Sequence, residues 1–226
     1  MAEITTIVLP TRPQPDTVVA IFLLKKFGYE EFPGVTQARV MTQSAIPQGE
    51  TFDSLLAQGT LALDVGGGPL DHHGKNECAS ELVAKYLQVD KDPSIAQLLS
   101  YAKRDDKEGK GTISRDALDR AFGLSGLIAA LNKANPGSPQ AVVDATLPML
   151  EAHWQSAYEH HVELPRDVEA KRTAGQYREH SVRQGDKHLK MVCVVSDKPS
   201  MPTYLRSERG GRADVVLQKA DRKSVV

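Results

Sequence analysis

Cysteine is scarce in this chain, and an unbroken apolar segment long enough to cross a membrane is absent. The two cysteines, Cys78 and Cys193, are far apart and fit no zinc-binding spacing, which disfavours a disulfide framework or a zinc ribbon. We predict that both are buried small side chains. No charged segment followed by an apolar one marks a secretion signal, so we expect a cytoplasmic location and no membrane partner.

The net charge of the chain is also close to zero. Basic residues number 28 and acidic residues 29, which gives a formal net charge of −1, so no global field attracts nucleic acid and a polyanion would need a local basic patch. Basic runs are more often solvated surface than binding sites. The candidate runs are Lys103, Arg104, Lys107 and Lys110, and Arg206 to Arg212 with Lys219, Arg222 and Lys223.

Several catalytic signatures are missing as well. The chain has no P-loop, no dinucleotide-binding glycine fingerprint and no nucleophile elbow for Ser-His-Asp catalysis. One adjacent histidine pair, His160 and His161, lies in an apparent helix, where neighbouring residues point about 100° apart. We interpret this pair as surface rather than as metal ligands.

The first 65 residues alternate in the manner of a parallel α/β sheet, which is the predicted fold class. Asp16 is predicted to cap the first helix, and the expected elements are strands over 4–9, 38–42 and 60–65 and helices over 17–27 and 52–58. Ligands of such sheets bind beyond the carboxyl ends of the strands. Because Asp16 and Asp64 follow or end two of these strands, we expect both at one edge of the sheet.

The rest of the chain is predicted to be a helical middle followed by a small β-containing appendage. The expected elements are helices over 78–87, 92–104 (started by Asp92 and Pro93), 118–131 and 139–162, a polar surface helix or linker over 165–180, a short helix over 202–209, and strands over 189–195 and 213–217. The last residues, 224–226, are interpreted as a strand that is cut short. We therefore predict two domains, residues 1–162 and 163–226.

The most informative segment covers residues 61–77 and reads LALDVGGGPLDHHGKNE. An apolar run ends on Asp64, three glycines follow, and Asp71, His72 and His73 stand side by side. Imidazole and carboxylate groups together form Mn²⁺, Fe²⁺ and Zn²⁺ sites, and a glycine-rich turn lets backbone N–H groups approach an anion closely. The segment therefore predicts metal-dependent phosphate chemistry.

A further acidic pair, Asp105 and Asp106, lies at the C-terminal end of a predicted helix. Carboxylates at that end oppose the helix macrodipole and need a nearby cation. A metal ion would supply one.

Taken in order, Pro15-Asp16, Asp64, the Asp71-His72-His73 triplet and Asp105-Asp106 resemble the motifs of the DHH phosphoesterase superfamily. This superfamily includes exonucleases, oligoribonucleases and family II inorganic pyrophosphatases, and LDVGG followed closely by DHH is most similar to a branch regarded as metal-dependent exonucleases. The resemblance covers residues 4–110 and is weak from Gly111 onward. No obvious copy of the superfamily's glycine-rich substrate-binding domain follows.

The resemblance implies a site for one or two metal ions that clamp a phosphoryl group and activate water. Mn²⁺ is the expected ion, and Fe²⁺, Zn²⁺ and Mg²⁺ are the alternatives. Its implied ligands are Asp16, Asp64 as a bridge, His72 and Asp105. His73 is implied to touch the substrate phosphate and Asp71 to support the histidines, which makes these two the catalytic candidates.

Other groups are candidates for contact with the substrate phosphate. They are Arg12, Lys75 and Arg104, together with the helix N-terminus at residues 78–80 as an anion seat. The expected partner is a phosphorylated small molecule or a short single-stranded nucleic acid.

Two positions depart from the superfamily pattern. Its first motif commonly has a histidine four residues before the aspartate and a second aspartate two residues after it, where this chain has Arg12 and Val18. Each change removes one metal ligand. The hypotheses are therefore a metal-dependent phosphoesterase, a regulatory protein that binds metal or nucleotide without turnover, and a pyrophosphatase on the same scaffold.

Overall fold

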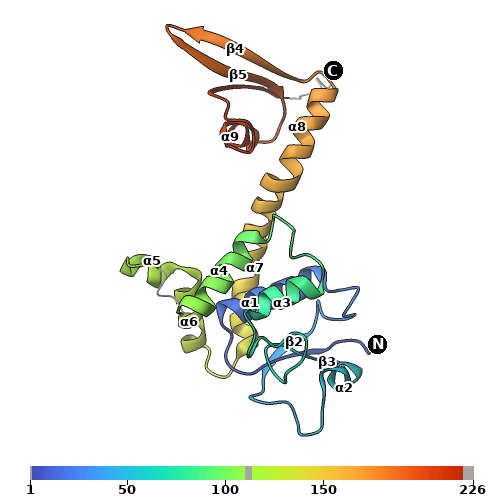
Figure 1. Ribbon diagram of the computed structural model, residues 1–226. Coiled ribbons are helices and arrows are strands. Elements are labelled where there is room, and N and C mark those ends of the chain that lie inside the picture. Colours follow the sequence, from blue (N-terminus) through green and yellow to red (C-terminus); the bar gives the residue numbers. More distant parts are fainter. Residues whose placement is uncertain (1, 110–113, 221–226) are drawn as a thin grey trace, which may run out of the picture. The chain divides into compact units, whose positions relative to one another are not determined.

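The structure is a computed structural model that describes residues 2–109 and 114–220 (Figure 1). The chain forms two compact units, and the division falls between Trp154 and Gln155, near the end of helix α7 (Pro139–Tyr158). The boundary expected from the sequence, after residue 162, lies later in the chain. Lys110, Arg222, Lys223 and the expected strand at 224–226 lie outside the described residues.

The first unit is built on a three-stranded parallel sheet. Its strands are β1 (Thr6–Leu9), β2 (Arg39–Thr42) and β3 (Thr60–Ala62), in the order β2-β1-β3. Ile7 of the central strand pairs with Val40 on one side and with Leu61 on the other. The prediction of a parallel α/β sheet is confirmed.

Alternation along the strands separates the apolar side chains of this sheet into two clusters. Ile7, Leu9 and Leu61 belong to the main core, whereas Val8 and Ala62 form a smaller cluster with Leu55 of helix α2 (Phe52–Ala57). Because successive side chains of a strand point to opposite faces, the sheet lies between these clusters.

Helix α1 (Pro15–Phe27) is the centre of the main core. Every residue from Pro15 to Leu24 is buried, which is expected of a helix covered on all sides. It packs against α3 (Ala79–Tyr86) and α4 (Ala96–Glu108) (Figure 1). The prediction that Asp16 is its N-cap is wrong, because the cap is Gln14 and Asp16 is the second helical residue.

Two further helix boundaries differ from the predictions. The helix expected over 118–131 is divided at Gly123 into α5 (Ala117–Phe122) and α6 (Leu124–Ala134), because Gly123 has an extended backbone with φ −66° and ψ 160°. The helix expected from Asp92 begins only at Ala96. The carboxylate of Asp92 instead accepts hydrogen bonds from the backbone and hydroxyl of Ser94, which makes a local turn.

The second unit begins at Gln155 with the last residues of α7, which continue into a π-helical turn, Glu159–Glu163, and then into α8 (Leu164–Thr173). Pro165 explains the turn, because its ring has no N–H and crowds the carbonyl four residues earlier. The sheet of this unit has the order β4-β5-β6, with β4 (Tyr177–Gln184) antiparallel to β5 (Lys187–Val195) and β6 (Val215–Lys219) parallel to it. Helix α9 (Met201–Arg206) precedes β6.

Strand β4 was not predicted. Its sequence, YREHSVRQ, is polar and all of it after Tyr177 is exposed, so the apolar alternation that reveals strands is missing. Pairing with β5 makes it a strand. The small core of the unit contains Leu164, Tyr177, Val192, Val194, Met201, Tyr204, Leu205 and Ala213.

None of the helices in the described ranges has both the length and the apolar character that a membrane crossing requires.

Gly59, which precedes β3, offers a test of the sheet. Its φ is +77°, and a Cβ there would lie 2.8 Å from the backbone oxygen of Glu3, whereas Gly137 has φ +74° with open space around it. We expect Gly137→Ala to cost about 1 kcal/mol, from the left-handed backbone alone. Gly59→Ala adds a backbone clash and should cost about 1–3 kcal/mol more. Urea unfolding of both variants measures the difference, and equal losses would contradict the predicted clash.

Candidate metal centre

Four separate segments bring acidic and imidazole groups together beyond the carboxyl ends of the strands. Asp16 comes from the first turn of α1, Asp64 follows β3, Asp71 to His73 form the next turn, and Asp106 lies in the last turns of α4. The expectation that Asp16 and Asp64 lie at one edge agrees with this placement, since both approach His72.

The turn between β3 and α3 fixes Asp64 in an unusual backbone conformation. Its φ is +61°, in the left-handed region that non-glycine residues seldom adopt. The N–H of Asp64 donates to the carbonyl of Leu70, which closes the glycine-containing loop and brings Asp71 back beside Asp64. A strained backbone at a buried carboxylate is a feature typical of functional sites.

Asp64 and His72 meet without a hydrogen bond. Oδ1 of Asp64 and Nδ1 of His72 are 2.9 Å apart, yet both atoms are buried and neither has a hydrogen-bond partner. Oδ2 of Asp16 lies 3.6 Å from the same nitrogen. Two atoms bound to one ion at about 2.0–2.2 Å lie about 3 Å apart in an octahedral site and about 3.4 Å apart in a tetrahedral one. The distances of the two aspartate oxygens from the His72 nitrogen are thus close to those between ligands that share one cation.

Asp16 also caps the N-terminus of helix α3. Its carboxylate accepts hydrogen bonds from the N–H groups of Ala79, at 2.8 Å, and Ser80, at 2.9 Å, the first two residues of α3. The N-terminus at 78–80 was predicted to be a seat for a substrate anion. That prediction is wrong, because the carboxylate of Asp16 already fills it. The two bonds hold the carboxylate in place beside His72.

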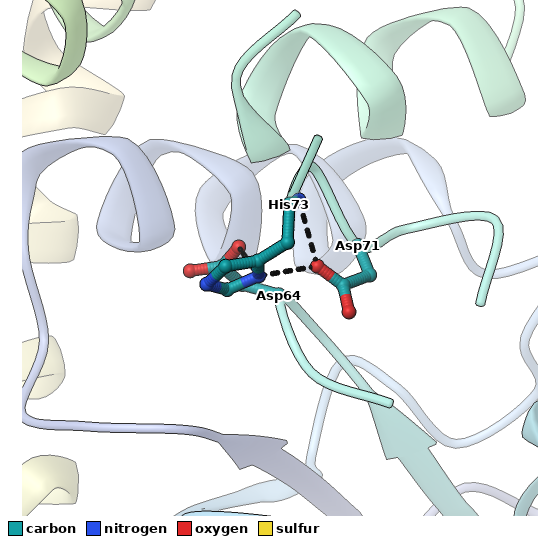
Figure 2. A group of neighbouring side chains, drawn as sticks. All are labelled: Asp64, Asp71 and His73. Carbon is teal, nitrogen blue, oxygen red and sulfur yellow. Dashed lines mark hydrogen bonds and ion pairs between the residues drawn. The ribbon is translucent and has the colours of Figure 1, made fainter. Parts of the chain in front are cut away.

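Asp71 orients His73. Oδ1 of Asp71 accepts from the His73 backbone N–H at 3.0 Å and lies 2.6 Å from Nδ1 of the ring (Figure 2). Oδ2 accepts from the N–H of Gly67 at 2.7 Å. Nδ1 is thus bound to a carboxylate, and Nε2 of the largely exposed His73 side chain is left for another partner. Asp71 and His73 also form, with Asp64, a group whose ligand atoms lie within 4.8 Å of one another.

Of the two acidic residues at the end of α4, Asp106 approaches His72. Its Oδ2 lies 4.0 Å from Nε2 of His72. The resemblance instead implies Asp105 as the ligand. It is buried, with 2% exposure, and lines the cavity described below. The sequence pattern left this choice open, because adjacent helical residues point in different directions.

Burial and mutual repulsion govern the charges of this cluster. Burial raises the pKa of Asp64 to about 6; His72 lowers it and the carboxylate of Asp16 raises it. The hydrogen bond to Asp71 raises the pKa of His73. Burial works against the ionised form of Asp71, but hydrogen bonds from His73 and Gly67 hold its pKa below the usual range. Several carboxylates thus surround His72, and a cation would stabilise their ionised forms.

The predicted phosphate contacts lie in three places. The Lys75 ammonium donates to the carbonyl of Gly68 at 3.4 Å, in the same turn as the site. Arg12 is exposed and lines a cavity of about 320 Å³ beside Pro15 and Asp105, the chain neighbours of Asp16 and Asp106. Arg104 lines a different cavity, of about 190 Å³, with Tyr101 and Arg120. Val18, at the other departing position, is fully buried in the core.

The remaining candidates are separate from this cluster. His160 and His161 are half-buried rather than at the surface; His160 packs edge-on against Tyr204, and Nη1 of Arg209 lies 2.9 Å from Nδ1 of His161. Cys78 is buried as predicted, and burial raises the pKa of its thiol to about 12, which disfavours the reactive thiolate. Cys193 is half-buried.

The fold and the site define a mixed α/β protein with a carboxylate and imidazole cluster beyond the ends of its parallel strands. No protein-family model, no curated protein and no solved structure matches this chain.

Proposed function

We propose that the protein is a metal-dependent phosphoesterase of the DHH type, which hydrolyses a phosphodiester or phosphoanhydride in a nucleotide or short oligonucleotide. The observation that carries this proposal is the buried contact of Asp64 Oδ1 with His72 Nδ1, at 2.9 Å and without a hydrogen bond. Buried polar atoms left without partners are costly. A divalent cation bound by both atoms would remove that cost.

The donor set fits such an ion. Asp16, Asp64 and His72 would hold it, and Asp106 lies on the opposite nitrogen of the same imidazole, where a second ion would have its ligand. A mixed carboxylate and imidazole set favours Mn²⁺, Fe²⁺ or Zn²⁺ over Mg²⁺. When bound, the ion would neutralise phosphoryl oxygens and lower the pKa of a water molecule.

The chain's own residues would position the phosphate. His73 is exposed, is held by Asp71 through Nδ1, and has a raised pKa, so its Nε2–H can donate to a phosphate oxygen. Asp71 acts through His73 and is a positioning residue. Lys75 lies in the same turn and supplies a second positive charge.

A regulatory protein that binds without turnover is the second candidate. It is favoured by the two departing positions, because Arg12 is exposed in a cavity and Val18 is fully buried, so neither can supply the missing ligands. Any second ion would therefore have few protein ligands.

Turnover assays separate the two candidates. We expect the full chain with Mn²⁺ to release product from at least one of three substrates: a short single-stranded oligonucleotide, a cyclic dinucleotide or pyrophosphate. Asp64→Asn, which tolerates the left-handed backbone, should lower the rate by more than about 100-fold, since even the loss of an outer partner of a metal ligand costs about 10–100-fold.

Asp53→Asn is the matched control, since Asp53 is exposed in the first turn of α2, and it should leave the rate unchanged. Binding of these compounds with no product in any reaction would reject the enzyme in favour of the regulatory protein.

A further inference from the structure

The cavity beside the metal centre has features that the proposed function does not use. Its volume is about 320 Å³, at the small end of the range of about 300–1,000 Å³ for small-molecule sites. Its walls come from the segment before α1, from α4 and from α5 and α6. The lining includes Arg12, Pro13, Pro15, Arg120, Ile128 and Asn132.

Two arginines from distant segments line this cavity. The Arg12 side chain makes no hydrogen bond or ion pair with any residue in the described ranges. Nη1 of Arg120 donates to the carbonyls of Ser114, at 3.1 Å, and Arg115, at 2.9 Å, which leaves Nη2 and Nε without hydrogen bonds among the described residues. With Asp105 as the one carboxylate, the lining keeps a net positive charge. Guanidinium groups bind phosphate oxygens through paired N–H donors.

The walls of the cavity are held in place by hydrogen bonds between elements. The side-chain amide of Asn132 donates to the carbonyls of Pro13, at 2.8 Å, and Ile128, at 3.0 Å, and so fastens the start of α1 to α6. The hydroxyl of Tyr101 accepts from the N–H of Ser125 and fastens α6 to α4. Pro13 and Pro15 stiffen their segment further. A cavity that is already formed needs little ordering when a ligand binds.

The same contacts show what else the cavity can recognise. Since both amide hydrogens of Asn132 are donated, its Oδ1 remains an acceptor for a hydroxyl or amino group. Proline, isoleucine and alanine side chains form an apolar wall for a ring. An anion, a hydrogen-bonding group and an apolar face are thus accommodated within a volume suited to one nucleotide.

We propose that this cavity binds a phosphate monoester the size of a single nucleotide, with Arg12 and Arg120 on the phosphate. This inference rests on the proposed function and specifies its substrate: the nucleotide at the end of a chain, or a mononucleotide product, sits beside the metal centre. The site is joined to that centre through Pro15–Asp16 and Asp105–Asp106.

The test is binding of adenosine 5′-monophosphate to the full chain with EDTA present, measured by calorimetry, with adenosine and orthophosphate as partial ligands. We expect the monophosphate to bind and each partial ligand to bind at least about 10-fold more weakly. Arg12→Gln and Arg120→Gln should each weaken binding by about 10–100-fold. Arg12→Lys should weaken it by less, because lysine keeps the positive charge but lacks the paired N–H donors of a guanidinium group. Arg39→Gln, at an exposed position on β2, is the matched control and should bind like the unchanged protein.

A second variant tests the cavity itself. Ala129→Phe places a ring into the cavity from an exposed helical position, so it should abolish binding of the monophosphate without loss of fold. Absence of binding, or equal losses in the arginine variants and Arg39→Gln, overturns the cavity site. Uptake of Mn²⁺, measured separately by elemental analysis, decides the metal centre independently, so the failure of one proposal is distinguishable from the failure of the other.

Discussion

Replacing His72 with alanine is expected to abolish binding of Mn²⁺. The two ring nitrogens of His72 face carboxylates on both sides, Asp64 at 2.9 Å and Asp106 at 4.0 Å. Without it, the carboxylates of Asp16 and Asp64 lose the nitrogen between them and repel one another in a buried setting. Elemental analysis after dialysis should find Mn²⁺ in the unchanged protein and none in the variant. Asp64→Asn should give the same result.

Two controls make this test specific. His153→Ala removes an exposed histidine of α7 in the same unit and should retain the metal. His73→Ala removes the neighbouring ring, whose Nδ1 is already bound to Asp71, and should retain most of it. Unchanged metal content in His72→Ala, with circular dichroism showing an intact fold, would reject the metal centre. Loss in His73→Ala alone would move the ion to the group formed by Asp64, Asp71 and His73.

Replacing Asp16 with alanine is expected to lower the free energy of unfolding by about 2–3 kcal/mol, even without metal. The substitution removes two charge-assisted hydrogen bonds and leaves the N–H groups of Ala79 and Ser80 buried at the start of α3. The substitution also removes the repulsion between the carboxylates of Asp16 and Asp64, and this change raises the free energy of unfolding. We expect the lost hydrogen bonds to dominate, because they are short, buried and aligned with the helix dipole.

Urea unfolding in the presence of EDTA measures this loss. Asp16→Asn keeps one carbonyl oxygen as an acceptor and should lose about half as much. Asp53→Ala, in the first turn of α2, caps no other element and should change stability by less than about 0.5 kcal/mol. A neutral or stabilising effect of Asp16→Ala would mean that repulsion from Asp64 outweighs the cap.

Local patterns predicted the first unit better than the second. The parallel sheet was predicted because β-branched runs alternate with helical periodicity there. Strand β4 was missed because its exposed polar residues belong to a strand only through pairing with β5. The division of 118–131 at Gly123 was missed because a glycine is tolerated inside many helices.

The candidate site shows the same limit. Only a short loop separates Asp64 from the Asp71-His72-His73 triplet, so their proximity could be predicted from the sequence. That Asp106 rather than Asp105 reaches His72 depends on the rotation of α4 about its axis. Arg120 and Asn132 carried no signal, since each is a single polar residue in a helical region without a motif.

By itself, the sequence determined the parallel α/β core and the residue types that meet at its edge, because strand alternation, helical periodicity and a glycine-rich turn are local properties of the chain. Only the tertiary structure decided that Asp16 caps α3 while facing His72, and that Arg12 and Arg120 share a cavity. Contacts between segments far apart in the chain depend on how α1, α4 and α6 pack, and no local pattern encodes that packing.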